Sequence, residues 1–185
     1  MSAAELLALE DVGVLTETRM GITWCLTHRE PIEVCHCKAA SHNWGQHNAL
    51  RRYSGLVSSG KAHPFKQTGG QLVDFREGPK GVQLALSRAT TERVPLHSLV
   101  ATYAVNHEHV GRLIRGKADP PRSGNNPFEL SDKSTVLRMG GHHLLLDGHH
   151  RSTSDWAAGK THETMRVLSG LTPRFQNSSD FLLRP

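Results

Sequence analysis

The chain has 185 residues, of which 37% are hydrophobic and 5% aromatic, and it contains 17 Gly and 9 Pro. This length is enough for one domain, or for a small domain with a short additional module, and the composition predicts a loop-rich fold with a modest core. A net charge of +5 is compatible with nucleic acid as a partner but favours it only weakly, because the basic residues are spread along the chain.

Membrane association is not expected, because no apolar run approaches the roughly 20 residues that span a bilayer. Residues 1–15 lack the basic start of a secretory signal, so we expect a cytoplasmic protein. Within that stretch, residues 5–15 have the amphipathic pattern of a helix.

A cluster of cysteine and histidine follows between residues 25 and 37. The chain has three cysteines, and an odd number without a signal peptide favours reduced thiols or a metal site over disulfides. Four side chains are candidate ligands of a structural, tetrahedral Zn²⁺ ion: Cys25, His28, Cys35 and Cys37. His36 or His42 is an alternative to His28, and ordinary reduced cysteines are the alternative to zinc.

The next segments complete a predicted N-terminal module over residues 1–92, which zinc would stabilise. Apolar residues at helical spacing predict a helix over 42–57. Two apolar runs, 71–75 and 82–86, flank the turn-like sequence Arg-Glu-Gly-Pro-Lys-Gly and predict a β-hairpin over 71–86. The segment 55–62 is not a phosphate-binding P-loop, because Ala62 stands where the metal-binding Ser or Thr is required.

From residue 93 the pattern predicts a compact α+β domain that extends to residue 170, followed by a tail over 171–185. Asn106 is expected to cap a helix that ends at Gly116, and Gly140-Gly141 is expected to turn a hairpin. The remaining predicted elements are a strand at 93–96, a loop at 117–127, strands at 135–139 and 142–146, a helix at 149–158 and a strand at 163–168.

Residues 141–151, with the sequence Gly-His-His-Leu-Leu-Leu-Asp-Gly-His-His-Arg, are the most informative part of the chain. They predict a short strand that turns at Asp147 and Gly148 into a helix with two imidazoles and a guanidinium in its first turn. A helix start has unpaired N–H groups and a positive partial charge, so it suits phosphate or another anion. Helical spacing places His149 and His150 on different sides of the helix. Asp147 is a candidate Mg²⁺ ligand or base, or else a helix cap.

Residues 94–99, 135–151 and 157–159 together resemble the ParB/sulfiredoxin superfamily, over about residues 93–169. The resemblance implies a small mixed domain that binds the phosphate of a nucleotide or nucleic acid at the strand-to-helix turn. Four residues would then line the phosphate site: Gly148, His149, His150 and Arg151. His149 occupies the position of the reactive Cys of sulfiredoxins, so reduction of a sulfinic acid is not expected. The Asp-Gly-His-His-Arg form is most similar to the ParB-like nuclease and free serine kinase branches.

We therefore expect an enzyme that hydrolyses a phosphodiester or a nucleotide with the help of Mg²⁺ or another divalent metal. The expected catalytic residues are Asp147, His149, His150 and Arg151. Two alternatives stay open at this point: a small-molecule kinase of the free serine type, and a DNA-binding module without enzymatic activity.

Overall fold

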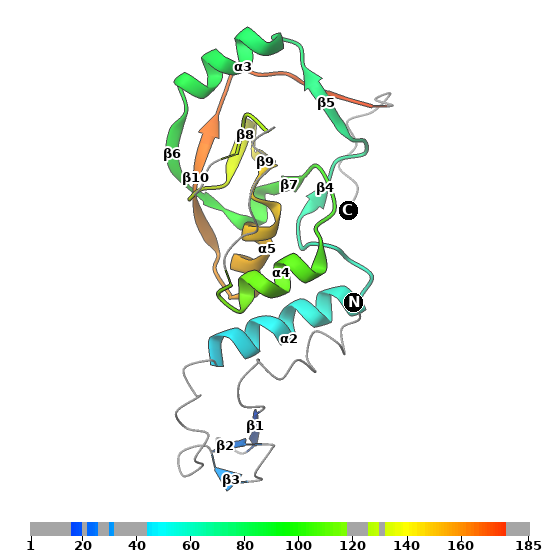
Figure 1. Cartoon of the computed structure of the whole chain (residues 1–185), viewed down its shortest axis with the longest axis vertical. Helices are drawn as coiled ribbons and strands as arrows, with labels where there is room; N and C mark the ends of the chain where they lie inside the picture. The colour runs from blue at the N-terminus through cyan, green and yellow to red at the C-terminus, as the bar shows by residue number, and fades with distance from the viewer. Residues whose placement is uncertain are drawn as a thin grey trace.

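The computed structural model describes residues 16–19, 22–25, 30–31, 44–117, 126–129 and 132–176. These residues form a mixed α+β protein, as the sequence predicts (Figure 1). The predicted helix over 5–15 lies outside the described residues. Cys25 ends a strand, but its side chain and the other predicted zinc ligands, His28, Cys35 and Cys37, also lie outside them.

The central element is a mixed sheet with the strand order β4-β7-β9-β8-β10-β6. β8 and β9 form the antiparallel hairpin predicted from Gly140 and Gly141. β7 and β4 continue the sheet in parallel beside β9, while β10 lies parallel to β8 and antiparallel to β6. The strands are β4 (Lys66–Gln67), β6 (Thr90–Pro95), β7 (Leu99–Ala101), β8 (Thr135–Met139), β9 (His142–Asp147) and β10 (His162–Leu168).

Both faces of this sheet are covered, and the side chains of β9 show this most clearly. Leu144 and Leu146 belong to a hydrophobic cluster on one face, whereas Leu145 belongs to a cluster on the other. All three are at most 5% exposed. A strand that is buried on both faces needs a continuous apolar run, which explains the sequence Leu-Leu-Leu at this point.

Three helices form a group beside the central sheet. They are α2 (Trp44–Ser58), α4 (His107–Ile114) and α5 (His149–Ala157), and they pack on one another through a cluster that includes Tyr53, Val110 and Ala157. Trp156 contacts this cluster and also the cluster around Leu145, so α5 connects the helices to the sheet. The predicted helices over 42–57 and 149–158, and the Asn106 cap of α4, are confirmed.

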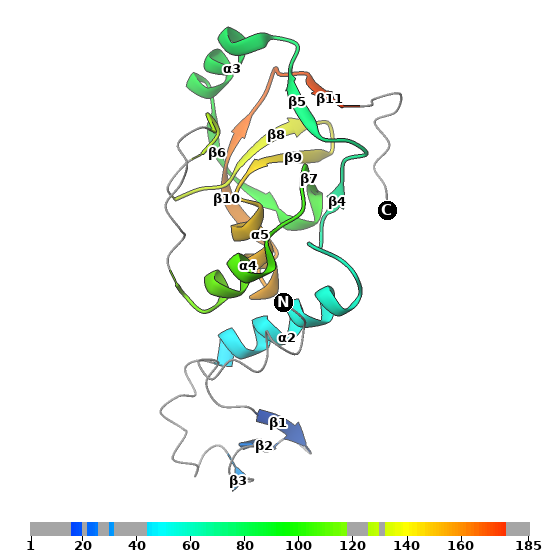
Figure 2. The ribbon, with the colours of Figure 1, turned by 45° about the vertical axis from the view of Figure 1, so that its right-hand side comes forward.

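The predicted β-hairpin over 71–86 is wrong in its second half. Leu72–Phe75 is strand β5, but Gly78–Ser87 is helix α3, with Val82 and Ala85 buried. A short apolar run does not distinguish a buried strand from a helix by its periodicity. β5 instead pairs antiparallel with β11 (Pro173–Phe175), from the predicted tail (Figure 2).

Residues 1–92 contribute to the central sheet as well as to a separate small sheet. β4 and the start of β6 come from the N-terminal side of the predicted boundary at residue 93. A three-stranded antiparallel sheet is formed by β1 (Thr16–Arg19), β2 (Ile22–Cys25) and β3 (Glu30–Pro31). None of the helices in the described ranges has the length and apolar composition needed to cross a bilayer.

Candidate functional site

Asp147 is the last residue of β9, and the pairing of β9 with β8 is irregular immediately before it. Val136 pairs with Leu145, whereas Thr135 pairs with Asp147, so Leu146 is an extra residue on β9. A β-bulge of this kind bends the strand and changes the direction of the side chains that follow. The bulge therefore sets the direction in which Asp147 leaves the sheet at the turn into α5.

Gly148 is the N-cap residue of α5 and has a left-handed backbone conformation, with φ 92° and ψ 18°. Glycine has no side chain, so Gly148 makes no side-chain hydrogen bond to the N–H groups in the first turn of the helix. These groups carry the positive end of the helix dipole. A Cβ atom at this position would overlap the Ser134 side chain and lie 2.9 Å from Ser134 Cα. Both the dihedral angles and the packing therefore require glycine.

A buried carboxyl group lies under this turn. Glu163 Oε1 accepts a hydrogen bond from Ser134 Oγ at 2.5 Å, and Oε2 accepts one from Ser152 Oγ at 2.7 Å. Both serines are fully buried and Glu163 is only 8% exposed. Burial raises the pKa of Glu163, and the two serine hydrogen bonds oppose that shift. The network connects the residue before β8, the first turn of α5 and β10.

His149 is buried and its ring is fixed by the backbone of a neighbouring segment. Nε2 accepts a hydrogen bond from the Thr102 backbone N–H at 3.1 Å and also lies 3.1 Å from Thr102 Oγ1. Because a backbone N–H can only donate, Nε2 is unprotonated and the proton lies on Nδ1. Burial, followed by the nearby His63 and His150, holds the pKa of His149 well below its usual value. His149 is therefore a neutral group that holds the end of β7.

His150 makes the same type of contact with Asn106, four residues after Thr102 in the same loop. Its Nε2 accepts a hydrogen bond from the Asn106 backbone N–H at 3.0 Å, and its ring lies 4.2 Å from that of His109. The proton of a neutral His150 is thus also on Nδ1. The two histidines point in different directions, as the helical spacing predicts, and together they hold both ends of the segment that joins β7 to α4.

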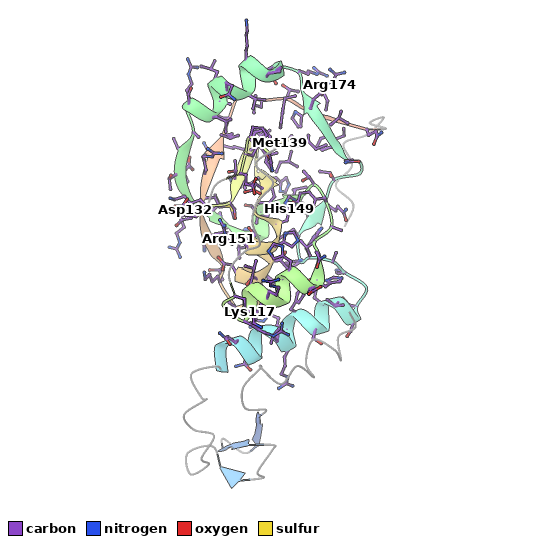
Figure 3. All side chains as sticks on the ribbon, in the orientation of Figure 1. Lys117, Asp132, Met139, His149, Arg151 and Arg174 are labelled. Carbon is purple, nitrogen blue, oxygen red and sulfur yellow. The ribbon has the colours of Figure 1, made fainter. Side chains whose placement is uncertain are left out.

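Arg151 supplies positive charge on the same helical turn. Lys133 holds the pKa of Asp132 below its usual range, and the charge of Arg151 adds to this effect. Arg151 also opposes the raised pKa of Glu163. Figure 3 shows Arg151, Asp132 and His149 in the same part of the fold, around the start of α5. The guanidinium therefore lies near acidic side chains at the start of α5.

Asp147 contributes negative charge to the site, and this charge affects the pKa values of two side chains, Tyr103 and Arg166. Tyr103 is 42% exposed and its ring lies 3.7 Å from that of His149. Partial burial, together with the charges of Asp147 and Glu129, raises the pKa of Tyr103 to about 12. Burial lowers the pKa of Arg166, and Asp147 opposes that shift. Tyr103 and Arg166 are therefore members of the site.

The predicted site residues 147–151 lie together in the turn and the first turn of α5, but several of their partners were not predicted. Glu163 had a detectable signal, because it alternates in phase with Met165 and Val167, which are buried. Thr102, Tyr103 and Ser134 lie outside the regular elements, where periodicity gives no signal; they follow β7 or precede β8.

Metal ligands are not gathered in the described part of the chain. No group of three or more His, Cys, Asp or Glu side chains there is placed to hold a metal ion. The predicted zinc site at Cys25, His28, Cys35 and Cys37 lies outside these residues.

Gly148→Ala is expected to reduce the free energy of unfolding by more than about 2 kcal/mol. The left-handed backbone costs a residue with a Cβ about 1–2 kcal/mol, and the overlap with Ser134 adds to this cost. Gly140→Ala is the matched control, because Gly140 has a φ of 59° with no atom within 4 Å of the added Cβ. Urea denaturation of the two variants measures the difference, and equal losses would contradict close packing under Gly148.

Glu163→Gln is expected to become more stable relative to the wild type as the pH rises from 4 to 8. The raised pKa means that the native state retains a proton that the unfolded state loses above about pH 4.3, so the wild type loses stability as the pH rises. Glutamine retains polar partners for both serines and does not ionise. Urea denaturation at several pH values tests this, and a stability difference that does not change with pH would contradict it.

His149→Gln is expected to lessen the loss of stability on acidification. The lowered pKa of His149 means that its contribution is present above about pH 6.5 and is lost as the pH falls, because the unfolded state then binds a proton that the native state excludes. Glutamine can still accept the Thr102 N–H bond. The slope of unfolding free energy against pH between 7 and 5 is the measurement, with His97→Gln at an exposed position as the control.

Known proteins provide no relative from which to assign the site. No family model matches the chain, and neither a curated protein nor a solved structure matches it. Any function assigned to the turn at residues 147–151 therefore depends on the contacts described above.

Proposed function

We propose that the turn at residues 147–151 binds the phosphate of a nucleotide or nucleic acid and that the protein hydrolyses a phosphodiester or nucleotide phosphate bond there. The observation that carries this proposal is the flanking of an N-cap glycine by Asp147 and Arg151 at the start of α5. A phosphate at such a start accepts backbone N–H bonds in the field of the helix dipole. The resemblance of residues 93–169 to the ParB/sulfiredoxin superfamily supports the same ligand class.

Arg151 and Asp147 have complementary roles in the proposed reaction. The Arg151 guanidinium binds phosphate oxygens through two parallel N–H bonds and offsets the charge that develops on them. Asp147 takes the proton of the attacking water as the new phosphorus–oxygen bond forms. The bond to the leaving oxygen breaks, and solvent water protonates that oxygen. Tyr103, with its raised pKa, stays protonated and can donate a hydrogen bond to the ligand.

The two histidines act mainly through position. His149 is 1% exposed and its Nε2 is occupied by Thr102, so it orients the loop instead of exchanging a proton with the ligand. His150 is more exposed, and its Nε2 accepts a hydrogen bond from the Asn106 backbone N–H, so it holds the other end of the same loop.

A divalent metal would fit this arrangement only as an ion held jointly with the substrate. Asp147 would supply one carboxylate and the phosphate the other ligands, which suits Mg²⁺ because it retains water and takes few protein ligands. Bound in that way, Mg²⁺ would offset negative charge on the phosphate oxygens.

Arg151→Ala is expected to lower kcat/KM for hydrolysis at least 100-fold, since a charge stabiliser of this kind contributes about 3–4 kcal/mol to the transition state. Arg151→Lys should restore only part of the activity, because lysine cannot form the two parallel bonds. The substrates are bis(p-nitrophenyl) phosphate, single-stranded DNA and ATP, each with Mg²⁺. Circular dichroism establishes that each variant is folded.

Arg76→Ala is the matched control, because Arg76 is exposed and lies between β5 and α3, far from α5 in Figure 1. Full activity in Arg151→Ala would reject the proposal. Incubation with ATP and free serine separates the remaining classes of activity: phosphoserine would identify a small-molecule kinase instead of a hydrolase. Phosphate binding without any turnover would identify a binding module.

A further inference from the structure

Two hollows on the surface adjoin each other along the connection between α2 and β4. The larger hollow, of about 560 Å³, is lined by residues 60–69. The second, of about 350 Å³, is lined by residues of α2 and α5, by the segment that joins α5 to β10, and by residues 64–65 and 96–97. Pro64 and Phe65 line both hollows, so the two share one wall. We refer to the two hollows together as the basic-aromatic groove.

The groove has the charge of a site for a polyanion. Lys61 and Lys66 line the first hollow, and Arg52 and Lys160 line the second; all four side chains are exposed. Lys160 pairs with Asp155 at 2.8 Å, and Arg52 Nη1 donates a hydrogen bond to the Trp156 carbonyl at 3.2 Å. No acidic side chain is found among the described residues that line either hollow.

Aromatic rings line the same two hollows. Phe65 is half-buried at the shared wall, and Trp156 is half-buried in the second hollow. The ring of His63 lies nearly parallel to that of Phe65, with 5.9 Å between centroids and an angle of 18°. Rings that alternate with cations are the arrangement that stacks bases while holding the phosphates of one strand.

His63 gives an independent indication of a ligand. Its side chain lines the first hollow and is only 5% exposed, yet neither ring nitrogen makes a well-formed hydrogen bond to the described residues. A buried polar group without a well-formed hydrogen bond is costly, so natural proteins rarely leave one. Burial lowers the pKa of His63, and contacts with the backbone of Phe65 and of His63 itself oppose that shift.

We propose that the basic-aromatic groove binds a single strand of nucleic acid, with bases against Phe65 and Trp156 and phosphates against Lys61, Lys66 and Arg52. A duplex hides its base faces, so rings recessed in hollows favour an unpaired strand. This inference rests on the proposed function, because Trp156 lies on the helix whose first turn carries Arg151. From His149 to Ala157 that helix spans about 12 Å, so the groove and the proposed phosphate site lie at opposite ends of one short helix.

The test measures binding of fluorescein-labelled oligothymidylate to the full chain by fluorescence anisotropy at several KCl concentrations. In Lys61→Ala/Lys66→Ala, affinity is expected to fall and the slope of log K against log salt to decrease by about 1.4, since each phosphate contact on a single strand contributes about 0.7. Phe65→Leu is expected to weaken binding about fivefold or more with little change in that slope.

Lys80→Ala/Arg88→Ala is the matched control, because it removes two exposed cations, one in α3 and one at its C-cap, at the opposite end of the sheet in Figure 1. Its affinity is expected to stay within twofold of the wild type. Equal weakening in the two double variants, or equal affinity of the wild type for duplex DNA or heparin, would overturn the proposal in favour of general attraction to polyanions. Binding of thymidine monophosphate but not of the strand would also overturn it.

The two proposals can fail separately. Bis(p-nitrophenyl) phosphate is too small to occupy the groove and the turn at 147–151 together, so its hydrolysis reports only on the turn. Strand binding that depends on Lys61 and Lys66, without hydrolysis of this substrate, would support the groove and reject the proposed hydrolase. Hydrolysis of this substrate without strand binding would support the proposed hydrolase and reject the groove.

Discussion

The hydrogen bonds from two backbone N–H groups to the imidazoles of His149 and His150 determine how the site is built. They fix the segment between β7 and α4 against the first turn of α5, at Thr102 and at Asn106. Asn106 in turn caps α4 through His109, so the start of one helix positions the start of the other. Two adjacent residues thus hold both ends of one connection, and Tyr103 is brought over His149 as a consequence.

The same contacts separate the polar residues of the turn by function. The Thr102 N–H bond to Nε2 places the proton of His149 on Nδ1, and Asn106 contacts Nε2 of His150 in the same way. Asp147 and Arg151 are the charged residues that flank the turn. In the proposed function, ligand chemistry is assigned to these two residues, while the histidines position the adjoining loop.

The strand, turn and helix over residues 135–158 could be predicted because each has a strong local signal. Gly140 marks the hairpin, the apolar run marks β9, and Gly148 marks the start of α5. The helix at Gly78–Ser87 was missed because its short apolar run fits a strand equally well. The partners of the site could not be predicted, since Ser134 and Thr102 reach it through pairings between segments distant in the sequence. Only Glu163 could be predicted to be buried, because it alternates in phase with the buried residues Met165 and Val167.

Beneath the turn, the fold places groups whose charge is suppressed. Burial raises the pKa of Glu163 and lowers that of His149, so both shifts favour the uncharged form of the group. Hydrogen bonds hold the turn from below, to Glu163 through Ser134 and Ser152 and to His149 through Thr102. The Glu163 contribution to stability is lost as the pH rises above about 4.3, and the His149 contribution is lost as the pH falls below about 6.5. The two changes therefore overlap and oppose each other between these pH values.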